Sequence, residues 1–284
     1  MDTRVSSGAH EVIIGHNRPT VLIGERINPT GKKMLSAALA VGDMTVVQRM
    51  ALSQVQAGAD ILDVNVGLPG VDEAVLLPRA VRAVMEVADV PLCLDSRNVE
   101  ALRAALEVYT GKAIVNSVNG QPASLAQILP LVKEHGAAVI GLAMKERGVP
   151  YGAEERVAVA RLIVEHAEAL GIPRQDVIID CLALAVGVDS NAGMVTLEAA
   201  RRVRDELRVN QTLGINNISF GLPQREVLTS TFAILAIAAG VTCLLVDVAK
   251  VRPAVVSADL ALGRDDYAQR YIKAYRHTRA SASG

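Results

Sequence analysis

The chain has 284 residues and a formal net charge of −1, and 51% of its residues are hydrophobic whereas only 2% are aromatic. This composition supports a large aliphatic core and is typical of parallel α/β proteins, whose strands are covered on both faces. No basic run is longer than a pair, which argues against nucleic acid as a main partner. The scattered Cys93, Cys181 and Cys243 lack metal-ligand spacing, so we expect buried thiols and no protein-bound metal.

The sequence contains no targeting or membrane segment that we recognise. Its amino terminus lacks the apolar core of a signal peptide. The longest apolar run, residues 232–246, is interrupted at Gly240 and is too short to span a bilayer. We therefore expect a cytoplasmic protein with no membrane partner.

Short apolar runs alternate along the chain with longer segments of helical periodicity. The predicted strands cover residues 20–27, 61–67, 91–96, 112–118, 137–144, 176–184, 211–220 and 242–249. The predicted helices cover residues 43–57, 73–87, 98–108, 123–135, 153–169, 195–207, 224–239 and 252–261. Several helical segments are followed by glycine, which ends a helix at little cost.

Eight strand–helix units in this length predict a single-domain (β/α)8 TIM barrel over residues 19–279. Residues 1–18 are expected to form an N-terminal arm, residues 265–276 a terminal helix and residues 280–284 a C-terminal tail. An open, doubly wound sheet would carry a GxGxxG turn after its first strand, and "GERINPTGKK" lacks that spacing.

Polar residues recur at the carboxyl ends of the predicted strands, where a barrel of this type places its functional groups. They are Glu25 and Asn28, Asp63 and Asn65, Asp95, Asn116, Asp180, Asn217 and Ser219, and Asp247. Strand alternation would put Asn217 and Ser219 on one face and turn Asn216 away from the lumen. Any one of these residues could be only a helix N-cap or part of a self-satisfied network, but together they predict a polar pocket at the barrel mouth.

Acids and amides of this kind match a flat heterocycle that displays an amino group, ring N–H groups and a carbonyl. A 2-amino-4-oxo pteridine and guanine both fit that description. The sequence has no P-loop for a nucleotide phosphate.

Seven motifs, "VLIGERINPTGKK", "GADILDVNVG", "PLCLDSRN", "IVNSVNG", "HGAAVIGLAM", "VIID" and "LGINNISFGLPQRE", together resemble the pterin-binding methyltransferase family. That family includes methyltetrahydrofolate:corrinoid protein methyltransferases and the folate domain of cobalamin-dependent methionine synthase. The resemblance implies that a methyl group moves between N5 of (methyl)tetrahydrofolate and the cobalt of a corrinoid, in a direction that the sequence leaves open.

The resemblance also implies roles for individual residues. Asp95, Asn116 and Asp180 would hydrogen-bond the pterin ring, and Asn217 would be the catalytic amide near N5. Asn65 and Glu25 complete the expected pterin-binding set. One departure is Cys181, which stands where the family often has proline.

The corrinoid is expected on a separate protein, because no histidine of this chain lies in a DxHxxG cobalamin-binding motif. Family members are commonly homodimers, so the resemblance implies a homodimer here. Two alternatives stay open: a dihydropteroate synthase-like enzyme and a non-catalytic folate-binding barrel. The synthase is disfavoured because the first loop lacks its Ser/Asp-rich motif and the seventh strand carries Asn217 in place of a lysine.

Overall fold

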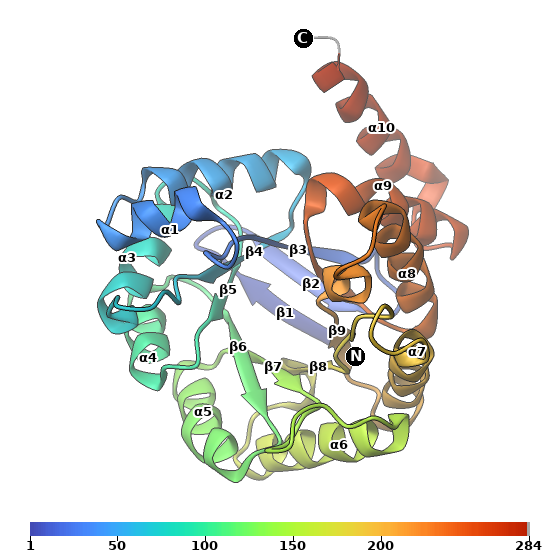
Figure 1. Cartoon of the computed structure of the whole chain (residues 1–284), viewed down its shortest axis with the longest axis horizontal. Coiled ribbons are helices and arrows are strands. Elements are labelled where there is room, and N and C mark those ends of the chain that lie inside the picture. The colour runs from blue at the N-terminus through green and yellow to red at the C-terminus, as the bar shows by residue number, and fades with distance from the viewer. Residues whose placement is uncertain (283–284) are drawn as a thin grey trace.

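The computed structural model describes residues 1–282 and forms the predicted single-domain (β/α)8 barrel (Figure 1). Its parallel eight-stranded sheet has the order β10–β3–β4–β5–β6–β7–β8–β9. The sheet closes between β9 and β10, where the N–H groups of Thr242 and Leu245 donate to the carbonyls of Gln211 and Leu213, both at 3.0 Å. The strands are β3 (Val21–Ile27), β4 (Ile61–Asn65), β5 (Leu92–Asp95), β6 (Ile114–Asn119), β7 (Ala138–Leu142), β8 (Val177–Asp180), β9 (Asn210–Thr212) and β10 (Cys243–Val246).

Helices follow the strands and form the outer ring of the barrel (Figure 1). They are α1 (Lys33–Ala40), α2 (Thr45–Ala57), α3 (Glu73–Met85), α4 (Val99–Val108), α5 (Pro122–His135), α6 (Ala153–Ala169), α7 (Ala192–Arg202), α8 (Arg225–Ala239) and α9 (Val248–Ala261). Helix α1 was not predicted. Helix α10 (Gln269–Ala282) projects from the barrel beside α9, and residues 283–284 of the predicted tail lie outside the described residues.

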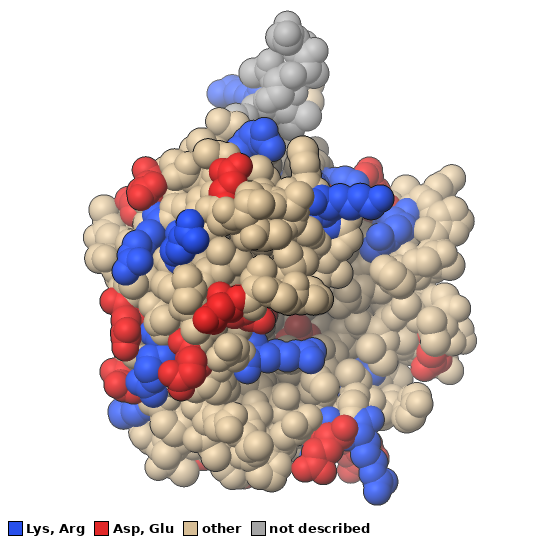
Figure 2. All heavy atoms as spheres, turned by 60° about the vertical axis from the view of Figure 1, so that its left-hand side comes forward, with Lys and Arg blue, Asp and Glu red and all other residues tan. Residues whose placement is uncertain are grey.

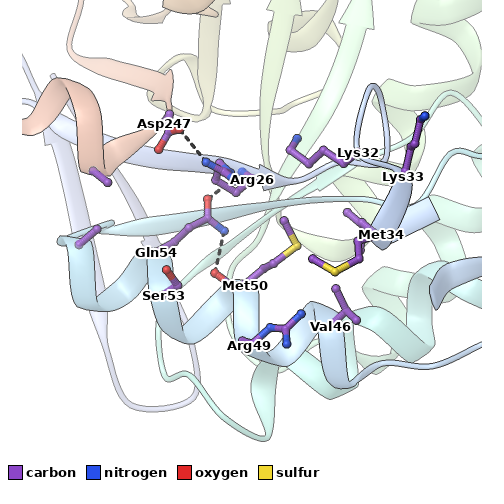
Figure 3. A pocket seen from close by; sticks show the side chains of 13 residues that line it. Arg26, Lys32, Lys33, Met34, Val46, Arg49, Met50, Ser53, Gln54 and Asp247 are labelled. Carbon is purple, nitrogen blue, oxygen red and sulfur yellow. Dashed lines mark hydrogen bonds and ion pairs between the residues drawn. The ribbon is translucent and has the colours of Figure 1, made fainter. Parts of the chain in front are cut away.

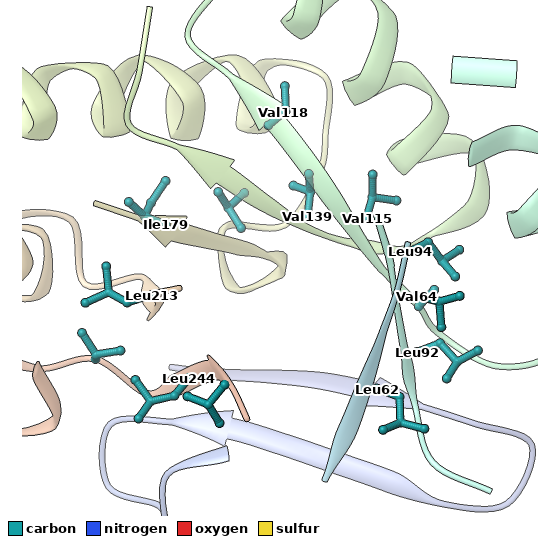
Figure 4. Packing of buried hydrophobic residues seen from close by; sticks show 14 of the residues in the cluster. Leu62, Val64, Leu92, Leu94, Val115, Val118, Val139, Ile179, Leu213 and Leu244 are labelled. Carbon is teal, nitrogen blue, oxygen red and sulfur yellow. The ribbon is translucent and has the colours of Figure 1, made fainter. Parts of the chain in front are cut away.

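Alternation along the strands divides the core into two layers. Outward-facing residues such as Leu62, Leu94 and Val115 are fully buried and pack against the helices (Figure 4). The residues between them face the lumen and pack against one another, among them Ile23, Ile61, Cys93, Ile114, Ala138, Ile178 and Cys243. Because both faces are buried, the strands are nearly continuous apolar runs, and this made them recognisable in the sequence.

An N-terminal β-hairpin closes the amino end of the barrel. Its strands, β1 (Asp2–Ser6) and β2 (Glu11–Gly15), are antiparallel. Val5, Val12 and Ile14 pack into the lumen cluster. Asn210, the first residue of β9, donates its side-chain amide to the Thr3 hydroxyl at 2.8 Å and to the Ile14 carbonyl at 3.0 Å. The segment predicted as an arm therefore seals one end, and the carboxyl end of the barrel forms its mouth.

The seventh strand is much shorter than predicted. β9 ends at Thr212, and residues 215–219 form the 3-10 helix η3 (Ile215–Ser219). The Asn217 N–H donates to the Gly214 carbonyl at 3.2 Å, so the chain turns directly after the strand. Strand alternation does not apply in such a turn, so the predictions that Asn217 and Ser219 share a strand face and that Asn216 faces away from the lumen are wrong.

The face that carries α1 to α4 has acidic and basic side chains interspersed, and it is hollowed near its centre (Figure 2). No helix in the described part of the chain is both long and apolar enough to cross a membrane.

Candidate active site at the barrel mouth

Inward-facing polar side chains occupy the ends of neighbouring strands at the mouth. Asn65, the last residue of β4, is paired in register with Asp95 of β5, and Asp95 is paired with Asn116 of β6. Glu25 extends from the adjacent strand β3, and Asp180 ends β8, on the other side of β7. Five of the six predicted pterin-binding residues therefore lie toward the carboxyl ends of parallel strands, at the mouth: Asn65, Asp95 and Asp180 end their strands, and Glu25 and Asn116 stand two and three residues before the ends of theirs.

Three hydrogen bonds fix the orientation of the amides in this set. Asn65 donates to Asp95 Oδ2 at 2.9 Å and accepts from the Gly67 N–H at 2.9 Å, so both of its amide atoms are engaged. Asn116 donates to Asp63 Oδ1 at 3.1 Å. This bond directs the donor end of the Asn116 amide toward Asp63, which leaves its carbonyl oxygen as an acceptor for a ligand. Asn65 and Asp63 thus support the neighbouring Asp95 and Asn116.

Burial makes the mouth a poor environment for charged carboxylates. It raises the pKa of Asp63 well above its usual range, and the neighbouring charge of Asp95 raises it further. It also raises the pKa of Asp95, although the amide of Asn65 and the charge of Arg97 oppose that shift. The pKa of Glu25 is raised by burial as well. A ligand that presents several N–H donors would compensate for this lost hydration, because each carboxylate accepts hydrogen bonds.

Asp180 is held by the backbone that follows it. Its Oδ1 accepts from the Leu182 N–H at 2.6 Å, and Leu182 has a left-handed backbone with φ of 63°. Burial raises the pKa of Asp180 to about 7, against the opposing effects of the Leu182 and Gly214 N–H groups and the charge of Arg156. A leucine with positive φ is strained, so the surrounding structure must impose this conformation.

Arg156 imposes it. This residue of α6 is 1% exposed, and its guanidinium donates to the carbonyls of Cys181 at 2.9 Å and Leu182 at 2.8 Å. It also donates to the Pro150 carbonyl at 2.9 Å and the Thr196 hydroxyl at 3.1 Å. In the described part of the chain it forms no ion pair with a carboxylate. All four acceptors of this buried guanidinium are neutral. Arg156 therefore holds the loop after Asp180 in place through hydrogen bonds alone.

Arg156 was not predicted as a functional residue. It follows Glu154 and Glu155 at the start of a helix, where charged residues usually face solvent. No pattern in the sequence marks it as buried, because three of its four partners lie 25 to 40 residues further along the chain.

The two adjacent asparagines that follow β9 have different surroundings. The Asn216 amide donates to the Glu25 carboxylate. Asn217, the predicted catalytic residue, is exposed, and its side chain lies against Gly214. The structure therefore brings Asn216 to the mouth through Glu25 and places the Asn217 side chain at the solvent-facing edge of η3.

The raised pKa of Asp180 predicts how stability depends on pH. The pKa of the Asp180 carboxyl is raised from 3.8 to about 7 in the folded state. Its contribution to the free energy of unfolding is therefore fully present below about pH 4 and is lost as the pH rises toward 7. At about 1.4 kcal/mol per pKa unit, the loss is at most about 4 kcal/mol. We therefore expect Asp180→Asn to lose less unfolding free energy between about pH 5 and about pH 8 than the wild type does.

Urea unfolding at the two pH values measures this difference. Glu25, Asp63 and Asp95 shift in the same direction and are present in both proteins, so the comparison isolates Asp180. If both proteins lost the same unfolding free energy between the two pH values, Asp180 would not have the raised pKa that its burial implies.

The fold and the mouth define a class of protein: a (β/α)8 barrel with acidic and amide side chains gathered at the carboxyl ends of its strands. In the described residues no three His, Cys, Asp or Glu side chains are grouped so as to hold a metal ion. The chain belongs to the pterin-binding enzyme family, whose model matches residues 24–247.

Two kinds of relative share sequence with this chain. It is 27% identical over 266 residues to a methylcorrinoid:tetrahydrofolate methyltransferase from Eubacterium limosum, and the match covers 90% of this chain and 96% of that protein. It is 34% identical over 250 residues to a methionine synthase from Mycobacterium leprae (strain TN), and that match covers 83% of this chain. The chain spans only 21% of that methionine synthase, so it corresponds to one part of the larger protein.

Solved structures of dihydropteroate synthases share the fold. The enzyme from Xanthomonas albilineans, in complex with indole-2-carboxylic acid and 6-chloroguanine, superimposes with a TM-score of 0.70 at 22% identity, over 92% of this chain and 99% of that one. The Yersinia pestis enzyme with a pterine-sulfa conjugate also gives a TM-score of 0.70, at 15% identity and the same coverage. These likenesses concern the barrel alone.

Proposed function

We propose that this protein is a methyltransferase that moves a methyl group between N5 of (methyl)tetrahydrofolate and the cobalt of a separate corrinoid protein. The observation that carries the proposal is the match over nearly the whole length of a methylcorrinoid:tetrahydrofolate methyltransferase. The acidic and amide-lined mouth supports it, since a pteridine presents several N–H donors and a carbonyl to such groups.

In this proposal the pterin ring lies across the mouth. Asp95 and Asp180 accept hydrogen bonds from the ring N–H and amino groups, and Asn116 presents its carbonyl oxygen. Asn65 and Glu25 complete the pocket by holding Asp95 and Asn216 in place. Fixing the ring in one orientation removes a large part of the entropic barrier to the reaction.

The chemical step exchanges one bond for another. In the direction toward cobalt, the bond between N5 and the methyl carbon breaks and its electron pair stays on N5, while the reduced Co(I) corrinoid would supply the electron pair of the new carbon–cobalt bond. Hydrogen bonding toward N5 stabilises the charge that develops there, and we assign this role to Asn217. An amide is not an acid at working pH, so the proton that N5 gains comes from water or from a nearby acid such as Glu25, whose pKa is raised by burial.

The reaction can be tested by absorption spectroscopy. The protein is mixed with 5-methyltetrahydrofolate and either free cob(I)alamin or a reduced corrinoid protein, and the expected result is formation of the methylated corrinoid. Folate binding without transfer to either acceptor would favour a non-catalytic barrel. Release of diphosphate from a dihydropterin diphosphate and 4-aminobenzoate would favour a synthase instead.

We further propose that the protein is a homodimer and that it is cytoplasmic. The molecular mass of the protein in solution tests whether it is a dimer.

A further inference from the structure

A polar side chain occupies a core position on helix α2. The buried residues of this helix are Val47, Ala51 and Gln54, which lie on one helical face at spacings of four and three residues. Gln54 is 4% exposed, and a buried amide costs free energy unless it is hydrogen-bonded. Its Oε1 accepts from the Arg26 backbone N–H at 2.7 Å, and its Nε2 donates to the Met50 carbonyl at 3.3 Å (Figure 3). Gln54 therefore ties α2 to strand β3 in one fixed orientation.

Strand β3 contains an extra residue beside this contact. Its register with β4 shifts by one residue between Gly24 and Ile27, and its pairing with β10 ends at Gly24. Glu25 and Arg26 therefore lie in a β-bulge. Within the bulge, the Arg26 N–H donates to the Gln54 side chain, which takes the place of a carbonyl of a neighbouring strand.

Gly24 leaves room for the Gln54 side chain. A Cβ atom at position 24 would lie 2.6 Å from Gln54 Oε1 and 3.1 Å from Gln54 Cδ. Such distances are too short, so any other residue at position 24 would push the amide away from the Arg26 N–H. The contact between α2 and the bulge thus needs both the glycine and the glutamine.

The bulge changes which way the side chains of β3 face. Ile23 packs in the lumen and Ile27 packs beneath the helices, although strict alternation would put residues 23 and 27 on the same face. Glu25 lies between them and accepts a hydrogen bond from the Asn216 amide at the mouth. The position of the Glu25 carboxyl group therefore depends on where the extra residue is inserted.

We propose that Gln54 is a positioning residue for Glu25 and that Gly24 is the residue that admits it. Gln54 fixes the bulge by accepting from the Arg26 N–H, and the bulge directs the Glu25 carboxyl group to the mouth. The inference rests on the proposed function, because methyl transfer is the reaction that uses Glu25 there. Gln54 lies between β3 and α2, on the helix side of the sheet, so its loss should slow transfer more than it weakens folate binding.

The test measures single-turnover methyl transfer, the folate dissociation constant and urea unfolding on the same proteins. Gln54→Met removes the acceptor with a side chain of similar size, and Gly24→Ala displaces the amide while Gln54 stays in place. We expect each variant to slow transfer about 10-fold and to change the dissociation constant less than about 3-fold. The displaced atoms are the end of a flexible side chain, so Gly24→Ala should fold even if Gln54→Met does not.

A conservative variant and a matched control accompany these two. Gln54→Glu keeps an acceptor oxygen for the Arg26 N–H and should retain most of the transfer rate. Gln48→Met is the same substitution earlier on the same helix, but Gln48 donates toward α3, to the Ala83 carbonyl at 3.2 Å and to Glu86 at 2.9 Å. The control should lose some stability without slowing transfer.

A double-mutant cycle with Glu25 separates positioning from simple stability. Glu25→Gln is expected to slow transfer by itself. Adding Gln54→Met to it should slow transfer no more than about 2-fold further, because the residue that Gln54 positions is already changed. The double variant should still unfold at a lower urea concentration than Glu25→Gln does, since the Arg26 N–H has lost its acceptor.

Every other outcome contradicts the inference. Unchanged transfer rates in Gln54→Met and Gly24→Ala overturn it and leave the methyltransferase proposal standing. A rate loss from Gln54→Met that persists in full in the Glu25→Gln background also overturns it, because Gln54 would then act by another route. An equal rate loss in Gln48→Met would make the effect one of stability alone. A wild type that transfers no methyl group to either corrinoid acceptor overturns this inference together with the proposed function.

Discussion

Asn217→Ala is expected to slow methyl transfer about 10²- to 10³-fold while weakening folate binding far less. Asn217 lies on η3, which follows β9, and its side chain is exposed and lies against Gly214. A donor that acts on charge developing at N5 contributes mainly to the transition state, so its removal lowers the rate more than the affinity. Single-turnover rates and folate dissociation constants, measured on the same protein, separate the two effects.

The neighbouring Asn216→Ala variant is the matched control. It deletes an identical side chain one residue earlier, but the lost contact is the hydrogen bond to Glu25. Because that bond lowers the pKa of Glu25, the variant should alter the pH profile more than the maximum rate. Equal losses of rate and affinity in Asn217→Ala, or a larger rate loss in Asn216→Ala, would contradict the role assigned to Asn217.

Arg156→Met is expected to lower the free energy of unfolding by about 3 kcal/mol and to weaken folate binding. The substitution removes the donor of the buried Cys181 carbonyl and of the part-buried Pro150 carbonyl, while the Leu182 carbonyl keeps its hydrogen bond from the Thr196 hydroxyl. Each unsatisfied buried group costs about 1–3 kcal/mol, and part of this cost is offset because no charge remains buried. The substitution also releases the strained backbone that directs the Leu182 N–H at Asp180. Urea unfolding and folate titration measure the two effects.

Two further measurements separate positioning from simple stability. Thr196→Val removes one of the acceptors of Arg156 but leaves the bonds to Cys181 and Leu182, so it should cost stability with little loss of folate affinity. Arg156→Met should also raise the pKa of Asp180 further, since the charge of Arg156 lowers it. A destabilised Arg156→Met protein that binds folate as tightly as the wild type does would limit Arg156 to a structural role.

The fold was predictable because each barrel strand is buried on both faces. Segments such as Ile61–Asn65 and Val177–Asp180 are nearly unbroken apolar runs that end in a polar residue. Helix α1 escaped prediction because it has only eight residues and follows a loop rich in turn residues. The seventh strand was overextended because Ile215 and Ile218 resemble strand residues, whereas Gly214 and the two asparagines favour a turn.

The sequence predicted where candidate residues lie only when they stand at or near the end of a strand. The shared position of Asp95, Asn116 and Asp180 at the mouth was predictable in this way, because parallel strands bring their carboxyl ends to the same edge. The pairing of Asn216 with Glu25 joins residues 191 positions apart, and no local pattern reveals it. Arg156 is similar: a charged residue in the first turn of a helix gives no sign that it is buried.

The N-terminal hairpin has a consequence for the order of events in a two-substrate reaction. With Val5, Val12 and Ile14 packed into the base of the barrel, the amino end is filled, and a ligand in the proposed folate site would enter from the carboxyl end. In the proposed methyl transfer, a corrinoid protein that docks over this end would cover the folate, so the folate would bind before the protein and leave after it. The filled base of the barrel would then impose an ordered mechanism, with the small substrate first on and last off.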